Sequence, residues 1–291
     1  MDHPRESHLA IAEIGADRHV DDLSTRSHPH LPIRAAPPSS SPRIEGLAYS
    51  RCPARIPGAR SMQPEPRTAA RLHAVSRGLP RWVSWRGQTI RTGIFKTPVT
   101  GPLHVSAEGV EGDGQADRSV HGGLDKAVYA MDASSVHHWQ TELGRDDLAP
   151  GAFGENLTVA GWPETDVYIG DRFRIGGASF EVSQPRQPCS KLGLRMDDPG
   201  FPKRFFASGR VGYYLRVIES GTVQAGDEID RIAHEEGALD VASLVRIWLD
   251  RSAEAADLER ACALDALAAA WRDPLRRRLD RAKQPTKAIP A

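Results

Sequence analysis

One cysteine of this chain lies in a segment whose other residues favour thiol chemistry. The segment SQPRQPCSKL contains Cys189 directly after Pro188, and Pro185 stands earlier in the same segment. Because proline fixes φ and has no backbone N–H to pair in a sheet, we expect the segment to leave the preceding strand as a stiff loop. Such a loop holds the thiol at a defined position, which a metal ligand requires.

Two basic residues, Arg186 and Lys191, flank this thiol. Nearby positive charge lowers the pKa of a thiol and favours the thiolate, which binds soft metals or acts as a nucleophile. An inert buried cysteine at the end of a strand fits the local sequence equally well.

A glycine pair forms the centre of a second candidate segment, DGQADRSVHGGLDKAVY, residues 113 to 129. Gly122 and Gly123 permit a close backbone approach, and His121 and Lys126 add polar and basic groups on either side. The segment is therefore a candidate oxyanion site. A plain glycine-containing hairpin turn is the alternative.

A third segment, GAFGENLTV, places Asn156 after Gly154 and before a short apolar run. The amide of Asn156 both donates and accepts hydrogen bonds, so it suits the edge of a heteroaromatic ring or a phosphate oxygen. The same residues equally well form a turn before a strand.

Short β-type runs separated by turn residues must position these segments. Alternating apolar residues and Gly-Asp turns over residues 71–233 predict one mainly β domain with an antiparallel, barrel-like sheet. Arg172 is expected on a solvated strand face. The predicted strands are LHAVS, TIRTGIF, PLHVS, DVYIGDRFRIGG, ASFEVSQ, VGYYLRVI and GTVQAGDEIDRI.

Helical signals occur in two places. DASSVHHWQTEL predicts a helix with Asp132 as N-cap and an end at Gly144. Residues 238–284 change to the helical period and predict a three-helix extension, with Pro274 in the first turn of the last helix. Within this extension, one apolar helix face is predicted to consist of Leu264, Leu267, Ala268 and Trp271. These helices are too short to be stable alone and must pack on each other or on the sheet.

Residues 1–70 are rich in Pro, Ser, Arg and His and cannot bury much apolar surface, so we expect a disordered leader without assigned function. Alternatively, translation starts at Met62, just before the first strand-like run.

The bulk composition excludes several classes of protein. The chain has 291 residues with 38 basic and 38 acidic side chains, so no global field draws it to nucleic acid or an anionic membrane. Its three cysteines, which include Cys52 and Cys262, are widely spaced and fit reduced thiols. No apolar run approaches the ~18 residues of a membrane helix, and no signal or transit peptide is evident. We expect a cytoplasmic protein with neither a nucleic-acid nor a membrane partner.

The order of the motifs points to a family. HGG with DKAVY, then FGENL, then YIGDRFRIG, then SQPRxPCxKL, followed by the helical tail, resembles MOSC-domain proteins of the YiiM-like group from about residue 72 to 282. The resemblance implies a barrel-like MOSC domain that binds a molybdenum cofactor (Mo-molybdopterin), with Cys189 as the protein ligand to the metal. It assigns His121, with Cys189, to catalysis, as a cofactor contact or as a proton donor. The residues assigned to cofactor binding are Gly122, Gly123, Lys126, Asn156, Arg186 and Lys191.

The resemblance also implies a reaction. The family is related to enzymes that reduce N-hydroxylated small molecules such as amidoximes and hydroxylaminopurines, an activity that detoxifies N-hydroxylated bases. Because no flavin, nicotinamide or CxxC motif is present, a separate electron-donor reductase must supply the electrons. No pyridoxal phosphate binding is expected, and a homodimer is one expectation, since the family often forms dimers.

Three rival functions stay open at this point. A carrier protein would hold the cofactor, or a persulfide on Cys189, without reducing an external substrate. A thiol hydrolase would use Cys189 with His121, and a purely structural β domain would use neither.

Overall fold

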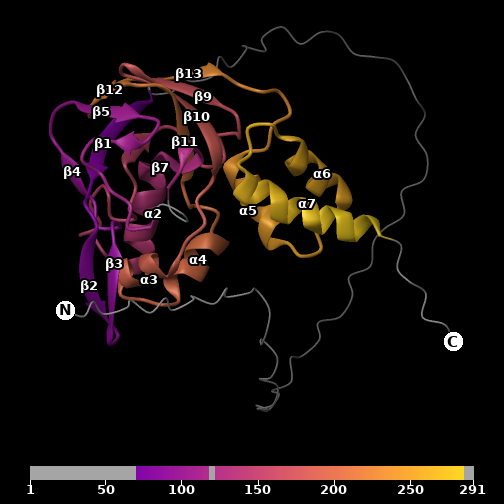
Figure 1. Cartoon of the computed structure of the whole chain (residues 1–291), viewed down its shortest axis with the longest axis horizontal. Coiled ribbons are helices and arrows are strands. Elements are labelled where there is room, and N and C mark those ends of the chain that lie inside the picture. The colour runs from indigo at the N-terminus through magenta and orange to yellow at the C-terminus, as the bar shows by residue number, and fades with distance from the viewer. Residues whose placement is uncertain (1–69, 118–121, 285–291) are drawn as a thin grey trace, which may run out of the picture. The chain divides into compact units, whose positions relative to one another are not determined.

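The structure is a computed structural model that describes residues 70–117 and 122–284. Its main element is an eight-stranded sheet of order β13-β9-β10-β11-β7-β8-β1-β4 (Figure 1). Neighbouring strands are antiparallel except β7 and β8, which are parallel. The strands are β1 (Arg71–Arg77), β4 (Thr97–Val99), β7 (Val128–Asp132), β8 (Leu157–Ala160), β9 (Arg172–Ile175), β10 (Ala178–Pro185), β11 (Tyr213–Glu219) and β13 (Ile229–Ala233).

Two smaller sheets accompany it. β12 (Gly221–Val223), β5 (Leu103–Ser106) and β6 (Gly109–Val110) form one, and β2 (Arg81–Trp85) with β3 (Gln88–Thr92) forms a separate hairpin. The mainly β prediction is therefore confirmed.

The main sheet curves back on itself without closing through a continuous ladder. Its terminal strands are β13 and β4. Backbone hydrogen bonds from Leu72 N to Asp227 O (2.8 Å) and from Ile229 N to Ala70 O (2.9 Å) nevertheless join the start of β1 to the start of β13. The arrangement is barrel-like, but it is not a closed barrel.

Three strand predictions need correction. TIRTGIF stops being a strand after Thr92, where the Thr92 hydroxyl accepts a hydrogen bond from Ile94 N (3.2 Å). In DVYIGDRFRIGG only Arg172–Ile175 is a strand, because Gly170 turns the backbone at φ 90°. Pro185 does not leave the sheet: it ends β10 paired with Tyr213, since the last residue of a strand can do without an N–H donor.

The helix over the sheet is confirmed. α2 (Ala133–Leu143) begins after Asp132, whose side chain accepts from Ser134 N, and ends at Gly144 in the left-handed conformation. Two short helices, α3 (Ser190–Met196) and α4 (Phe201–Ala207), were not predicted. Phe201 and Phe205 of α4 are buried on an aromatic core with Trp139 and Phe153 (ring centroids 5.0–6.4 Å apart).

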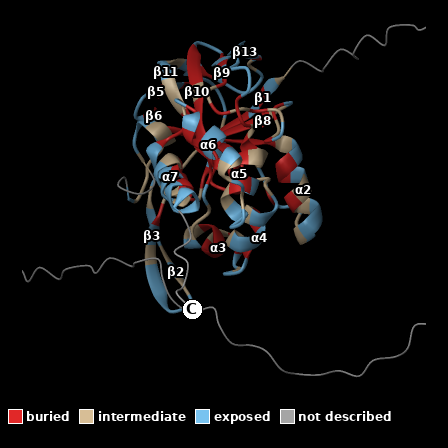
Figure 2. Ribbon diagram, turned by 90° about the vertical axis from the view of Figure 1, so that its right-hand side faces the viewer, coloured by how far each residue is buried: buried red, intermediate tan, exposed pale blue. Residues whose placement is uncertain are grey.

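The three predicted C-terminal helices are α5 (Val241–Leu249), α6 (Ala255–Ala263) and α7 (Ala269–Lys283). They contact one another, and α5 contacts β10, so the expected mutual packing is confirmed. Figure 2 shows buried residues on the sheet and exposed ones along the outward sides of α6 and α7. The division into a domain over residues 71–233 and an extension over residues 238–284 stays a prediction. Among the described residues, no helix is long and apolar enough to span a membrane.

Two details of this extension were wrong. Pro274 lies inside α7 rather than in its first turn, because the helix already begins at Ala269. Leu264, Leu267 and Ala268 are buried, but they lie in the connection between α6 and α7 rather than on a helix face. Apolar spacing alone does not separate a buried connection from a buried helix face.

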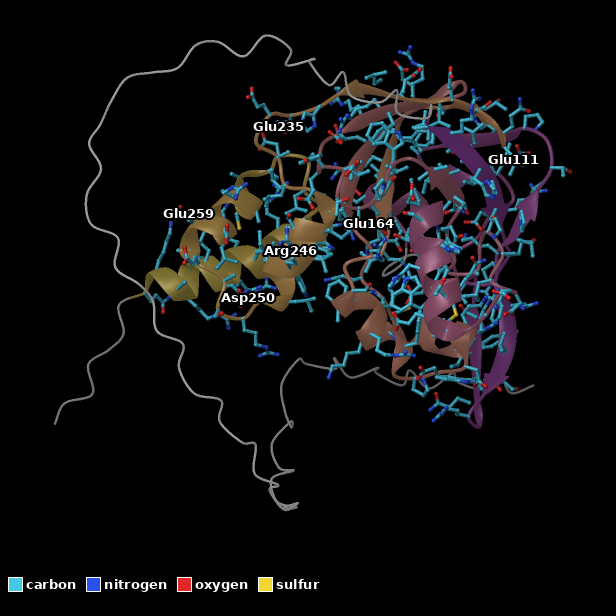
Figure 3. The ribbon with its side chains drawn as sticks, turned by 180° about the vertical axis from the view of Figure 1, so that it is seen from behind. Glu111, Glu164, Glu235, Arg246, Asp250 and Glu259 are labelled. Carbon is cyan, nitrogen blue, oxygen red and sulfur yellow. The ribbon has the colours of Figure 1, made fainter. Side chains whose placement is uncertain are left out.

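A buried carboxylate joins α2 to the sheet. Glu164 accepts hydrogen bonds from Ser135 Oγ (2.7 Å) and from Gly212 N (2.8 Å) (Figure 3). Burial raises the pKa of Glu164 above its usual 4.5. Because both contacts are internal to the protein, we assign Glu164 a structural role.

Candidate functional site

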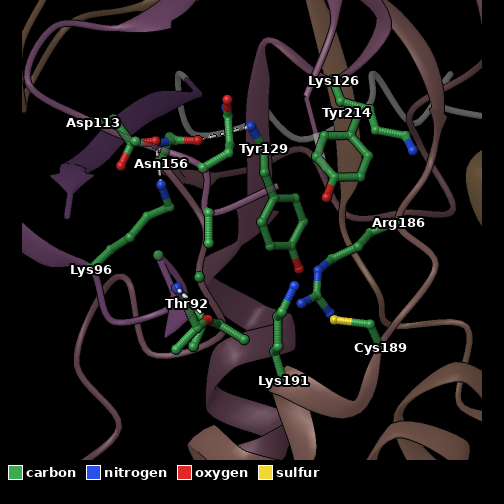
Figure 4. A pocket seen from close by; sticks show the side chains of 16 residues that line it. Thr92, Lys96, Asp113, Lys126, Tyr129, Asn156, Arg186, Cys189, Lys191 and Tyr214 are labelled. Atoms are coloured by element: carbon green, nitrogen blue, oxygen red, sulfur yellow. Dashed lines mark hydrogen bonds and ion pairs between the residues drawn. The ribbon is translucent and has the colours of Figure 1, made fainter. Parts of the chain in front are cut away.

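A pocket opens where β3, β7, β11 and the turn before α3 meet (Figure 4). The cavity measures about 80 Å³ and is partly open to solvent. The lining residues are Thr92, Gly93, Ile94, Lys96, Asp113, Gly114, Gln115, Ala116, Lys126, Tyr129, Gly154, Asn156, Arg186, Cys189, Lys191 and Tyr214.

Cys189 reaches this pocket from a very short loop. β10 ends at Pro185, Arg186 N donates to Gly212 O (3.2 Å), and Cys189 is already the N-cap residue of α3. The Cys189 carbonyl accepts from Leu192 N (2.9 Å), and the side chain is half-buried. The end of β10 and the start of α3 together hold the thiol in place.

Arg186 places a buried positive charge beside the thiol. The residue is only 5% exposed, and its guanidinium lies over the rings of Tyr129 (5.0 Å) and Phe205 (5.6 Å). Its Nη1 atom is buried and has no hydrogen-bond partner among the described residues. Figure 4 shows the guanidinium and the Cys189 sulfur side by side. A buried donor without a partner is costly, so this wall of the pocket suits an anionic ligand.

The opposite wall carries a buried ion pair. Lys96 Nζ contacts Asp113 Oδ2, and the two side chains are 8% and 5% exposed. The Asn156 amide donates to the same Asp113 oxygen (3.0 Å) and to Ser76 O (3.2 Å), while its oxygen accepts from Tyr129 N (3.2 Å). Both N–H donors of Asn156 are therefore used within the protein, and Asn156 positions Asp113.

Burial dominates the ionisation of this wall. It lowers the pKa of Lys96 below its usual 10.5, although Asp113 and Glu155 act in the opposite direction. Burial also raises the pKa of Tyr129 and of Tyr214, so both phenols keep their protons. The pocket is thus lined by two phenols that stay protonated, Tyr129 and Tyr214, in addition to its basic side chains.

The structure brings most of the predicted site residues together. Lys126, Asn156, Arg186, Cys189 and Lys191, which come from three separate motifs, line one pocket.

The glycine loop is the exception. Gly122 and Gly123, both described, are not among the lining residues, and His121 lies outside the described residues. Gly123 precedes the single turn η1 (Leu124–Lys126) with φ 93°. A Cβ there would meet nothing within 4 Å, so the conformation rather than close packing requires glycine.

Sequence reasoning did not single out Lys96, Asp113, Tyr129 or Tyr214. Tyr129 is the last residue of the DKAVY motif, so the motif itself was an available signal. Lys96 offered none, because nothing in FKTPV indicates that its side chain is buried against an acid from the β6–β7 connection.

The donor set fits a metal only in combination with a cofactor. Among the residues that the structure describes, no three or more His, Cys, Asp or Glu side chains form a group that could hold a metal ion. A metal bound to Cys189 would therefore take its other ligands from a cofactor. The buried Arg186 with Lys126 and Lys191 suits the anionic part of such a group, so the residues present fit a pterin-dithiolene cofactor with a phosphate tail.

An arginine links this pocket to the helical extension. Arg216 on β11 donates to Asp125 Oδ1 (2.6 Å) beside Lys126, to Glu181 Oε1 (2.9 Å) and to Ala266 O (2.7 Å). The turn that carries Lys126 is thus tied to the connection between α6 and α7.

We expect Arg216→Ala to lower the free energy of unfolding by about 2 kcal/mol, because three partners lose a charged donor at once. Urea unfolding measures the change. Arg172→Ala is the control: Arg172 pairs with the same Glu181 (3.0 Å), but it is exposed and should cost at most about 0.5 kcal/mol. Equal losses in both variants would contradict the linking role.

Several known proteins are similar to this chain. The family model of the MOSC domain matches residues 117–230. The uncharacterized protein YflK of Bacillus subtilis (strain 168) is 38% identical over 204 residues, which cover 70% of this chain and 92% of YflK. The chain belongs to the MOSC-domain family.

Further relatives place the chain in the YiiM-like group of this family. Protein YiiM of Escherichia coli (strain K12) is 38% identical over 145 residues, or 49% of this chain and 64% of YiiM. The crystal structure of YiiM from Geobacillus stearothermophilus has 33% identity and a TM-score of 0.61, covering 72% of this chain and 99% of that one. A Gibberella moniliformis protein named a reductase is 35% identical over 164 residues, 55% of this chain but only 29% of that protein.

Proposed function

We propose that this protein is a molybdenum-cofactor-dependent reductase of N-hydroxylated small molecules of the hydroxylaminopurine or amidoxime type. The observation that carries the proposal is the buried Arg186 with an unpartnered Nη1 beside the Cys189 thiol in one pocket. Membership in the MOSC family and a relative named a reductase support the class of reaction. The proposal includes a cytoplasmic location and leaves the homodimer as a prediction.

Each part of the pocket has a proposed task. Cys189 would ligate molybdenum, and Arg186, Lys126 and Lys191 would hold the anionic part of the cofactor. When bound, the cofactor supplies two-electron redox chemistry. Asn156 acts indirectly by fixing Asp113.

The reaction needs protons as well as electrons. Converting R–NH–OH to R–NH₂ and water takes two electrons and two protons: the N–O bond breaks, an N–H bond forms and the oxygen leaves as water. Lys96 is the proposed proton donor, because its ammonium faces the pocket and Asp113 orients Nζ. His121 stays a second candidate.

The test is reduction of benzamidoxime and a hydroxylaminopurine by the holoprotein, with dithionite-reduced methyl viologen as electron donor. Product amidine or amine is expected at a rate that follows the molybdenum content. A protein that retains stoichiometric molybdenum and pterin but reduces neither compound would be a carrier instead, and this outcome rejects the reductase proposal.

The proposed role of Lys96 predicts a pH dependence. Donation requires the ammonium form, so the rate should be full below the lowered pKa of Lys96 and should fall as the pH rises through it, before 10.5 is reached. The groups that face Lys96 are Asp113, Glu155 and Asn156. Arginine stays charged but does not release its proton. Lys96→Arg should therefore lower the viologen-driven rate about 100-fold and remove this falling limb.

Rate measurements from about pH 6 to pH 10 check the prediction. Lys203→Arg, on the exposed side of α4, is the matched control and should behave like the wild type. A Lys96→Arg profile with the wild-type falling limb would show that another group supplies the proton.

A further inference from the structure

The hairpin β2–β3 carries an uncompensated positive charge. From Arg71 to residue 107 the sequence has six basic residues and no acidic one, in a chain whose total charge is zero. Three of the six, Arg81, Arg86 and Arg91, belong to the hairpin and are exposed. Among the described residues, no carboxylate forms an ion pair with any of these three. The hairpin is therefore a local cationic surface on a neutral protein.

The two faces of this hairpin have different surroundings. Trp85 donates from Nε1 to Asp197 Oδ1 (2.9 Å), which ties its inner face to the end of α3. Trp82 and Arg91 form a cross-strand pair on the other face, and Trp82 is 69% exposed. Leu79, just before β2, is 68% exposed. The outer face thus combines an exposed tryptophan with arginine, and these two residue types contribute much of the binding energy at protein interfaces.

The hairpin also leads directly into the pocket. β3 ends at Thr92, and Thr92, Gly93 and Ile94 all line the pocket. Behind them, the guanidinium groups of Arg81 and Arg195 both lie over the Phe95 ring, at 4.2 and 5.2 Å. Two further positive charges thus lie at this end of the hairpin, over the residue that follows Ile94 of the pocket lining.

We infer that the outer face of this hairpin, defined by Trp82, Arg86 and Arg91, is the docking surface for an acidic electron-donor protein that carries a reduced flavin or iron–sulfur cluster. The inference rests on the proposed function, which needs two electrons per turnover from outside the chain. One reduced flavin supplies both electrons, or two reduced [2Fe–2S] proteins supply one each. Electron transfer slows steeply with distance, so the donor must dock close to the pocket. The hairpin meets this requirement, because β3 ends at Thr92 in the pocket lining.

The charge pattern decides between protein and nucleic acid as the partner. A nucleic-acid site usually extends basic residues along a stripe or groove, whereas here Arg81, Arg86 and Arg91 all lie on one short hairpin. Small, charge-steered and salt-sensitive contacts are typical of electron-transfer partners. The acidic donor is therefore the occupant that these residues favour.

The experiment compares two electron sources on the same holoprotein. The probes are an acidic FMN flavodoxin and an acidic [2Fe–2S] ferredoxin, each reduced beforehand, and methyl viologen is the small-molecule control. We expect Arg91→Glu and Trp82→Ala each to lower kcat/KM for the donor proteins by roughly 10- to 30-fold and to leave the viologen-driven rate unchanged. Wild-type kcat/KM should fall as the salt concentration rises, and this dependence should weaken in Arg91→Glu.

Two control variants separate docking from general charge and apolar effects. Arg277→Glu on the exposed side of α7 changes the net charge equally, and Ile232→Ala on β13 removes an exposed apolar side chain. Both should retain wild-type kcat/KM with the donor proteins. An equal loss in Arg277→Glu and Arg91→Glu would reject a specific docking face.

Direct binding keeps the two proposals distinguishable. Calorimetric titration of the oxidised donor proteins into each variant should show weaker binding only for Arg91→Glu and Trp82→Ala. If the wild type lacks viologen-driven activity but shows this binding pattern, the reductase proposal fails and the docking face stands. Unchanged donor binding in both hairpin variants overturns the docking face. The docking face is also overturned if the wild type binds a single-stranded oligonucleotide and only Arg91→Glu and Trp82→Ala lose this binding, because the face would then bind nucleic acid.

Discussion

Cys189→Ser is expected to lose molybdenum, and with it all reductase activity, while the fold stays intact. A serine hydroxyl is a hard, protonated donor and does not replace a thiolate as a ligand to a soft metal centre. Changing residues that only support a ligand costs about 10- to 100-fold in metal affinity, so removal of the ligand itself should cost at least about 100-fold. Because Cys189 is half-buried, the free energy of unfolding should change by no more than about 0.5 kcal/mol.

Metal analysis of the protein purified from a host that makes the cofactor, together with urea unfolding, measures both effects. Cys262→Ser is the matched control. Cys262 is buried on α6, so its serine variant should retain molybdenum but lose about 1–3 kcal/mol of stability. Wild-type molybdenum and activity in Cys189→Ser would contradict the ligand assignment. Retained molybdenum with loss of a cyanide-labile sulfur would favour the persulfide carrier.

Arg186→Met is expected to lower the affinity for the cofactor strongly and to change the stability of the apoprotein much less. Charge-assisted hydrogen bonds from a buried guanidinium are worth about 1.5–3 kcal/mol, so affinity for the cofactor should fall by roughly 10- to 100-fold. In the apoprotein the change removes two cation–π contacts, with Tyr129 and Phe205, but it also removes a buried charge without a carboxylate partner among the described residues. These effects oppose each other, so unfolding should change by no more than about 2 kcal/mol.

Arg186→Lys is the informative companion variant. Lysine keeps the charge but loses the planar, bidentate donor geometry and the stacking on aromatic rings. It should therefore bind the cofactor more tightly than Arg186→Met but less tightly than the wild type. Pterin and molybdenum content, compared with melting curves of the apoproteins, checks the order. Full cofactor retention in Arg186→Met would show that the buried guanidinium serves the fold alone.

A large part of the secondary structure could be predicted from local sequence patterns. The helix after Asp132 was predictable at both ends, because its N-cap side chain and its left-handed Gly144 are local devices. The alternating runs predicted most strands for the same reason, since alternation reports which side of a strand is buried. The predictions failed where buried residues do not recur at a regular spacing along the chain. Leu264 and Leu267 are buried in a connection, and α3 and α4 are too short for a clear helical pattern.

By itself, the sequence determined that Cys189 stands on a constrained segment beside two basic residues, and the order of the motifs determined the family. Only the tertiary structure decided what surrounds the thiol. Lys96 and Asp113 are far from Cys189 in the chain, and only the curvature of the sheet and the short connections bring them to one pocket. The same packing commits the Asn156 amide to internal partners and leaves the buried Arg186 with an unpaired donor. Burial and hydrogen-bond partners are properties of the packed chain, and residue types along a sequence do not specify them.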